Sequence, residues 1–143
     1  MIHVLCTGPE SSGTRLLTRL VGGLGIKTTH KSIPHALNWW DETAGITHIV
    51  CIVRDPFITQ ISATETGHPS FWSGREATFP YRITNAWQVM LDNCRTSGLP
   101  WIPLTYEGLL LRPQWTLDNI ADWIGVERKP LIEQVKDPRE NIR

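Results

Sequence analysis

Residues 2–21 read IHVLCTGPESSGTRLLTRLV, and the order of side chains in this stretch decides the fold. The apolar run over 2–7 predicts a β-strand, and the amphipathic run that follows Thr14 predicts a helix over 14–24. Gly8 and Gly13 bound the loop between them, with the Gly-x-x-x-x-Gly spacing of a phosphate-binding loop. Such a loop turns backbone N–H groups toward one point, where the helix N-terminus adds partial positive charge. We therefore expect the loop to bind an anion with the geometry of phosphate.

The end of this loop differs from that of the nucleotide-hydrolysing P-loops. Thr14 and Arg15 stand where those loops carry Lys followed by Ser or Thr. Because that Lys contacts the phosphates of ATP or GTP, its absence disfavours an ordinary ATP or GTP hydrolase. The sequence indicates a different phosphate-bearing donor.

Strand-like and helix-like patterns alternate along the rest of the chain. Strands are expected at 26–29, 47–53 and 100–105, and helices at 34–43, 56–64, 81–97, 114–124 and 128–136. This order predicts one α/β domain over residues 1–143, with three α/β/α layers around a mostly parallel sheet of four or five strands. Such sheets bind ligands beyond the carboxyl ends of their strands. Residues 64–80 have no period, which indicates a lid or acceptor-binding loop or, alternatively, a plain surface loop.

The composition restricts the class of function. Fourteen basic and fourteen acidic residues cancel, so nothing favours binding to nucleic acid. No apolar run approaches the roughly 20 residues that span a membrane, and no basic segment precedes an apolar one at the N-terminus. Cys6 and Cys51 lie in apolar runs and are expected to be buried and reduced, which favours a cytoplasmic location. No Cys/His spacing is typical of a zinc site, and no pattern indicates an oligomeric state.

A second candidate anion site follows the apolar run that ends at Val53. Arg54 is expected to leave the strand end toward the crevice that contains the glycine loop, and Ser62 lies two turns along the helix predicted at 56–64. A guanidinium and a hydroxyl placed in this way can clamp a phosphate. The alternative is a strand-end Arg54 paired with Asp55 or another carboxylate.

Two further residues are predicted at strand ends. His30 follows the expected strand at 26–29 and is a candidate general base at neutral pH, or else a structural histidine. Tyr106 follows the strand at 100–105, where its ring has two interpretations: a contact with a nucleobase, or a core tyrosine.

Together the four segments resemble the sulfotransferase family, whose donor is 3′-phosphoadenosine 5′-phosphosulfate (PAPS). The loop from Gly8 to Thr14, with Arg15 after it, is similar to the family's 5′-phosphosulfate loop, and Arg54-Asp55-Pro56 with Ser62 is similar to its 3′-phosphate motif. Lys27, Thr29, His30 and Pro34 are similar to the Lys-Thr-His-x-Pro segment of the cytosolic branch. The late family pattern is matched over 106–125. The resemblance covers about residues 2–64 and 81–126 and implies a P-loop sulfotransferase fold in an unusually short member.

The resemblance implies a role for each matching residue. The 5′-phosphosulfate would be held by Gly8, Pro9, Glu10, Ser11, Ser12, Gly13, Thr14 and Arg15. The 3′-phosphate would be bound by Arg54 and Ser62, and His30 would accept a proton from the acceptor. Ser11 stands where the family loop has Lys or Arg, so Arg15, Lys27 and Lys31 are candidates to supply that charge. No metal is expected.

The expected reaction is therefore transfer of a sulfuryl group from PAPS to a hydroxyl or amine of a small-molecule or carbohydrate acceptor. Two alternatives stay open: a P-loop kinase acting on a nucleotide or small molecule, and a nucleotide-binding module without transfer activity. Lys136, Arg139 and Arg143 are candidates for the C-terminal contacts that the family makes to the 3′-phosphate.

Overall fold

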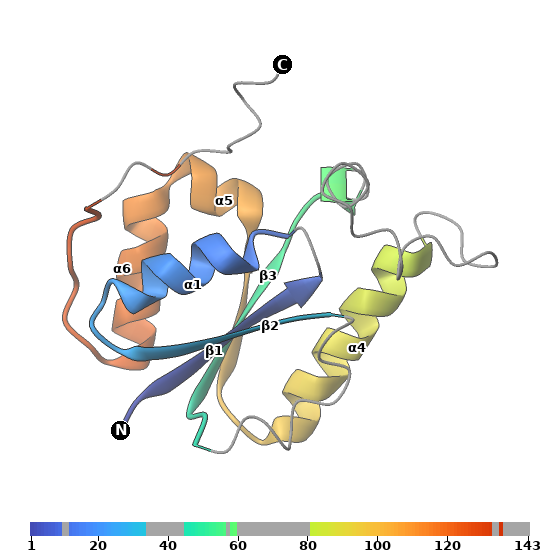
Figure 1. Cartoon of the computed structure of the whole chain (residues 1–143), viewed down its shortest axis with the longest axis horizontal. Coiled ribbons are helices and arrows are strands. Elements are labelled where there is room, and N and C mark those ends of the chain that lie inside the picture. Colours follow the sequence, from blue (N-terminus) through green and yellow to red (C-terminus); the bar gives the residue numbers. More distant parts are fainter. Residues whose placement is uncertain (10–11, 34–44, 57, 60–80, 133–134, 136–143) are drawn as a thin grey trace.

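The structure is a computed structural model that describes residues 1–9, 12–33, 45–56, 58–59, 81–132 and 135 (Figure 1). Four strands form one sheet: β1 (His3–Pro9), β2 (Lys27–Ile33), β3 (His48–Val53) and β4 (Trp101–Thr105). All neighbouring strands are parallel, in the order β2-β1-β3-β4. The prediction of an α/β fold with a parallel sheet is therefore confirmed.

Helices cover both faces of this sheet. The chain forms α1 (Thr14–Gly22), α4 (Tyr81–Ser97), α5 (Tyr106–Leu111) and α6 (Pro113–Ile124). Figure 1 shows α1, α5 and α6 on one side of the sheet and α4 on the other. The layers are α/β/α, as the alternation of patterns predicts.

Alternating side chains of the strands fill two cores. On the face covered by α1, α5 and α6, strand residues such as Val4 and Val50 pack with Leu17 of α1 and Ile120 of α6. On the opposite face, Leu5, Ile49 and Cys51 pack with Met90 and Cys94 of α4. Because neighbouring strand residues point to opposite faces, the central strands β1 and β3 are apolar on both sides.

The path of the chain changes direction between the two central strands of the sheet. From β1 the chain passes through α1 to β2 on one side, whereas β3 lies on the other side of β1. The direction of winding therefore reverses between β1 and β3, and α1 and α4 lie on opposite faces for the same reason. β1 ends at Pro9, within the loop bounded by Gly8 and Gly13, and β3 ends at Val53, directly before Arg54.

Several predicted boundaries need correction. β2 runs to Ile33 rather than ending at residue 29, so His30 lies within the strand instead of just after it. The helix expected at 128–136 is wrong, because 128–132 and 135 have no helical structure and Pro130 lacks the N–H that a helix interior needs. Helix α5 is not among the predicted elements. The helix expected at 34–43 lies outside the described residues; of 56–64, Pro56, Ile58 and Thr59 are helical.

Candidate functional site

The glycine loop lies between the end of β1 and the start of α1. Ser12 N donates a hydrogen bond to the carbonyl oxygen of Pro9 at 3.1 Å, and Gly13 accepts one from Leu17 N at 3.0 Å. Gly13 has φ of 92°, a left-handed conformation that glycine adopts without strain. A Cβ on Gly13 would collide with Cδ2 of Tyr106 and lie 2.7 Å from its Cε2. The loop thus needs glycine at this position both for its turn and for its contact with the tyrosine ring.

The start of α1 has the properties of an anion site. Gly13 is its N-cap and supplies no side-chain cap, and the first turn contains no acidic residue. The first N–H groups of a helix have no partner within it, and the helix dipole favours an anion beside them. Ser12 is fully buried, and among the described residues its Oγ has no hydrogen-bond partner. A buried hydroxyl without a partner is costly, and a bound oxyanion would satisfy it. Glu10 and Ser11 lie outside the described residues.

Arg54 lies beside the same loop. Its Cζ is 4.2 Å from the centroid of the Tyr106 ring, the geometry of a cation–π contact. The Tyr106 ring in turn lies against Gly13. Arg54 and Tyr106 are only 6% and 5% exposed. The guanidinium after β3 and the loop after β1 therefore share one aromatic ring at one edge of the sheet.

The backbone around Arg54 is fixed by hydrogen bonds from two elements. Asp55 N donates to Oε1 of Glu107 on α5 at 3.0 Å. Oδ1 of Asp55 accepts from Ile58 N at 3.1 Å, and Thr59 Oγ1 donates to the Asp55 carbonyl oxygen at 2.8 Å. Asp55 thus acts as an N-cap for the helical turn that follows. Ser62, the predicted partner of Arg54, lies outside the described residues.

His30 contacts the first residue of α1. Its Nε2 lies 2.9 Å from Oγ1 of Thr14, a hydrogen bond whose direction depends on the protonation of the ring. In the β1–β2 register His30 is opposite Cys6, on the sheet face that α1 covers. The candidate general base and the loop are therefore connected directly, through Thr14.

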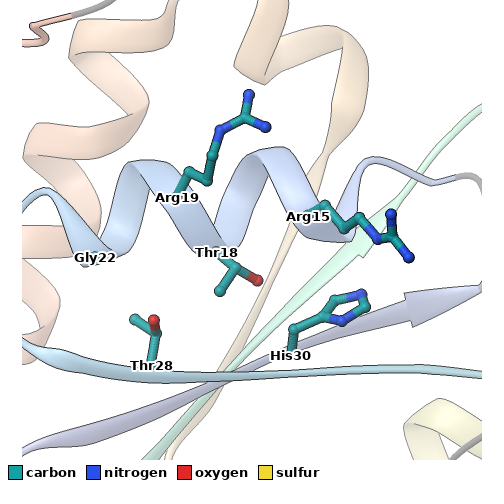
Figure 2. A pocket seen from close by; sticks show the side chains of 6 residues that line it. All are labelled: Arg15, Thr18, Arg19, Gly22, Thr28 and His30. Atoms are coloured by element: carbon teal, nitrogen blue, oxygen red, sulfur yellow. The ribbon is translucent and has the colours of Figure 1, made fainter.

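His30 also lines an open pocket between α1 and β2, with a volume of about 480 Å³. Figure 2 shows Arg15 and His30 at one end of this pocket and Gly22 and Thr28 at the other. Thr18 and Arg19 complete the described lining, which contains no carboxylate. The volume is in the range of pockets that hold small organic ligands.

Lys27 is the predicted site residue that the fold does not bring to the loop. It is the first residue of β2 and pairs with His3, whereas the loop follows Pro9, which pairs with Ile33. Six residues of strand, at about 3.3 Å each, put Lys27 about 20 Å from that end of the sheet. β2 therefore places Lys27 at the opposite end of the strand from the loop, and its expected catalytic role stays a prediction. Lys31 lies four residues nearer to the loop.

Tyr106 is a core tyrosine, which is one of the two interpretations that the sequence offers. Its ring belongs to the core between α1, α5 and the strand ends, and it supports both Gly13 and Arg54. Its proposed contact with a nucleobase stays a prediction. Thr14–His30 and Asp55–Glu107 are also contacts that the motifs do not indicate. Alternation along β2 contains a signal for the first of these, because Thr28, His30 and Ser32 share one face once the strand is extended.

Other residues bear on the class of site. Cys6, Cys51 and Cys94 are all free and buried, as predicted for Cys6 and Cys51. Burial raises the pKa of the Cys6 thiol to about 12. In the described part of the chain, no three His, Cys, Asp or Glu residues cluster as a metal site, and no helix there has the length and apolarity to cross a membrane.

No protein-family model matches the sequence, and no curated protein matches it.

Proposed function

We propose that the chain is a sulfotransferase with a P-loop sulfotransferase fold that transfers a sulfuryl group from PAPS to a hydroxyl or amine. The observation that carries the proposal is the shared Tyr106 ring, which has Gly13 of the loop and the Arg54 guanidinium against it. Two cationic or N–H-rich groups at the carboxyl ends of adjacent strands suit a ligand with two separate phosphates. PAPS carries its phosphosulfate and its 3′-phosphate at opposite sides of one ribose.

In this proposal the loop binds the 5′ end of the donor. N–H groups at the start of α1 and the hydroxyls of Ser12 and Thr14 would hold the phosphosulfate. Arg15, exposed on the first turn of α1, would offset charge that develops on the leaving phosphate. Sulfuryl transfer spreads charge over peripheral oxygens, so positioning and charge stabilisation are the main tasks of the protein. Arg54 would bind the 3′-phosphate and select against donors without it.

The acceptor would enter by the pocket between α1 and β2. His30 is the candidate general base, and its ring lies in this pocket beside Arg15 (Figure 2). A volume of about 480 Å³ accommodates a sugar or an aromatic ring. The acceptor class proposed is therefore a small molecule or carbohydrate with a nucleophilic hydroxyl or amine.

The first experiment compares ligands by calorimetry. Wild-type protein is titrated with 3′-phosphoadenosine 5′-phosphate (PAP), the desulfated donor product, and with ATP–Mg²⁺. The proposal expects PAP to bind more tightly, because only PAP has a 3′-phosphate for Arg54. Tighter binding of ATP–Mg²⁺ would instead favour a P-loop kinase. Transfer of labelled sulfate from PAPS to a panel of sugars and phenols then tests turnover.

Arg54→Ala should weaken PAP binding by about 1.5–3 kcal/mol, the scale of a hydrogen bond to a charged group. Adenosine 5′-phosphosulfate lacks the 3′-phosphate, so its affinity should change little in the same variant. Arg95→Ala, an exposed arginine paired with Asp92 on α4, is the matched control. Equal losses for the two ligands would show that Arg54 supports the fold and does not select the 3′-phosphate.

A donor-binding module without turnover is the second candidate. Ser11 replaces the basic residue of the family loop, and Lys27, one of the three candidates to supply that charge, lies at the far end of β2. This candidate predicts PAP binding with no sulfate transfer to any acceptor.

A further inference from the structure

The contact between Thr14 and His30 couples the loop to the candidate base. Thr14 Oγ1 and His30 Nε2 are 2.9 Å apart, and Thr14 is the first residue of α1, at the point where the helix dipole favours an anion. Thr14 is buried, as is the loop residue Ser12. The hydroxyl therefore has few directions in which to hydrogen-bond, and one of them is taken by the imidazole.

A hydroxyl has one proton to donate and two lone pairs to accept with. If Thr14 donates its proton to His30 Nε2, only lone pairs are left to face an anion in the loop. If Nε2–H donates to Thr14 instead, the hydroxyl proton is available to the anion. An anion that uses Thr14 thus requires a proton on Nε2.

This inference rests on the proposed function. We infer that binding of the donor in the loop fixes His30 in the tautomer protonated at Nε2. Nδ1 is then the ring nitrogen that accepts the proton of the acceptor. Thr14 is then a positioning residue that transmits occupancy of the loop to the base. The step breaks one N–H bond of the ring and forms another: Nδ1 releases its proton to water, and Nε2 takes up a proton from water. The reaction order that follows is donor first, acceptor second.

The described residues near His30 come from α1, β1 and β2. Arg15 and Arg19 of α1 line the same pocket as His30, and Figure 2 shows Arg15 at the end of the pocket that holds His30. From β1, the neighbouring Cys6 has its thiol pKa raised by burial to about 12, so it is neutral near pH 8. On β2 itself, Thr28 lines the pocket with His30, and Lys31 follows His30 in the strand.

Nitrogen NMR of the full chain tests the inference at pH 8.0, where the phosphates of PAP are fully ionised. The chain has five histidines, and the His30 signals are those missing from His30→Gln. Saturating PAP should raise the fraction of the Nε2–H tautomer in the wild type. Thr14→Val should abolish this change and weaken PAP binding about tenfold. Thr96→Val is the matched control, a threonine on α4 outside the site, and it should respond to PAP as the wild type does.

Two results overturn the inference while leaving donor binding intact. One is bound PAP with Nε2 unprotonated; the other is an equal tautomer change in Thr14→Val. Absence of PAP binding to the wild type would contradict both this inference and the proposed function. His30→Gln provides a separate measurement, since its amide can still donate to Thr14 but cannot accept a proton. PAP affinity should stay within about threefold while sulfate transfer is lost; a parallel loss of affinity would contradict the donor role of Nε2.

Discussion

At the scale of single residues, the site depends on close contacts around one tyrosine. Gly13 lies against the Tyr106 ring, and Arg54 stacks on the same ring at 4.2 Å. The glycine spacing and Arg54 are visible in the sequence, because a motif specifies residue types at fixed separations. The tyrosine that joins them is about 50 positions or more away from both. The contacts of Tyr106 with Gly13 and Arg54 depend on tertiary packing, which a local sequence pattern does not predict.

Gly13→Ala is the sharpest test of this contact. The added methyl group meets both a left-handed backbone and the Tyr106 ring, so we expect a loss of about 2–4 kcal/mol in the free energy of unfolding. Gly98→Ala is the matched control, because Gly98 has φ of 71° and no atom within 4 Å of the added carbon. It should cost about 1 kcal/mol. Urea unfolding measures both, and equal losses would mean that the ring contact is unimportant.

At the scale of elements, strands with apolar sequences were predictable and the polar strand was not. The apolar runs of β1, β3 and β4 define each strand to within two residues. β2 reads KTTHKSI, in which only the last residue, Ile33, is apolar, and its length is set by pairing with β1. The misplacement of Lys27 and His30 follows from that one boundary.

Helix α5 has a different origin. Its six residues include Gly108, which disfavours helix, and it starts where Thr105 Oγ1 accepts a hydrogen bond from Gly108 N at 3.1 Å. Because α5 begins with Tyr106, this cap also fixes the ring that supports Gly13 and Arg54. A short helix of this kind is determined by its cap and by tertiary packing more than by its periodicity.

Thr105→Ala should therefore destabilise the chain by about 1 kcal/mol and also weaken PAP binding. Thr105→Ser retains the hydroxyl and should restore most of both. Thr96→Ala removes another threonine hydroxyl, one that donates to the Asp92 carbonyl oxygen on α4, and it should leave PAP affinity unchanged. Chemical denaturation and calorimetry give the two quantities. Wild-type PAP affinity in Thr105→Ala would separate the cap from the site.

At the scale of the whole molecule, one parallel sheet carries both the stability and the site. Its two central strands place thiols in the cores on opposite faces, Cys6 toward α1 and Cys51 toward α4, where Cys51 Sγ lies 3.1 Å from Cys94 Sγ. Burial raises the pKa of Cys6 to about 12 from 9.0, because a thiolate is poorly solvated in an apolar core. The pKa of Cys51 is raised as well, first by its hydrogen bond with Cys94 and then by burial.

These shifts predict that the fold is sensitive to alkali. The unfolded chain releases the Cys6 proton above about pH 9 while the folded chain retains it, so stability is complete below pH 9 and falls as the pH rises toward 12. Between pH 8 and pH 10 the loss attributable to Cys6 should be about 1.4 kcal/mol. Cys6→Ala should show a correspondingly smaller decrease. Parallel pH profiles of unfolding free energy in the two proteins would contradict the assignment.

The central claim is that the ends of β1 and β3 bind the two phosphates of one adenosine carrier. A crystal structure of the chain with PAP tests this most directly. We predict the 5′-phosphate within hydrogen-bond distance of the N–H groups of Gly13 and Thr14, and the 3′-phosphate on the guanidinium of Arg54. PAP bound away from the loop, or a 3′-phosphate held by other cations while Arg54 stays apart from it, would contradict the claim.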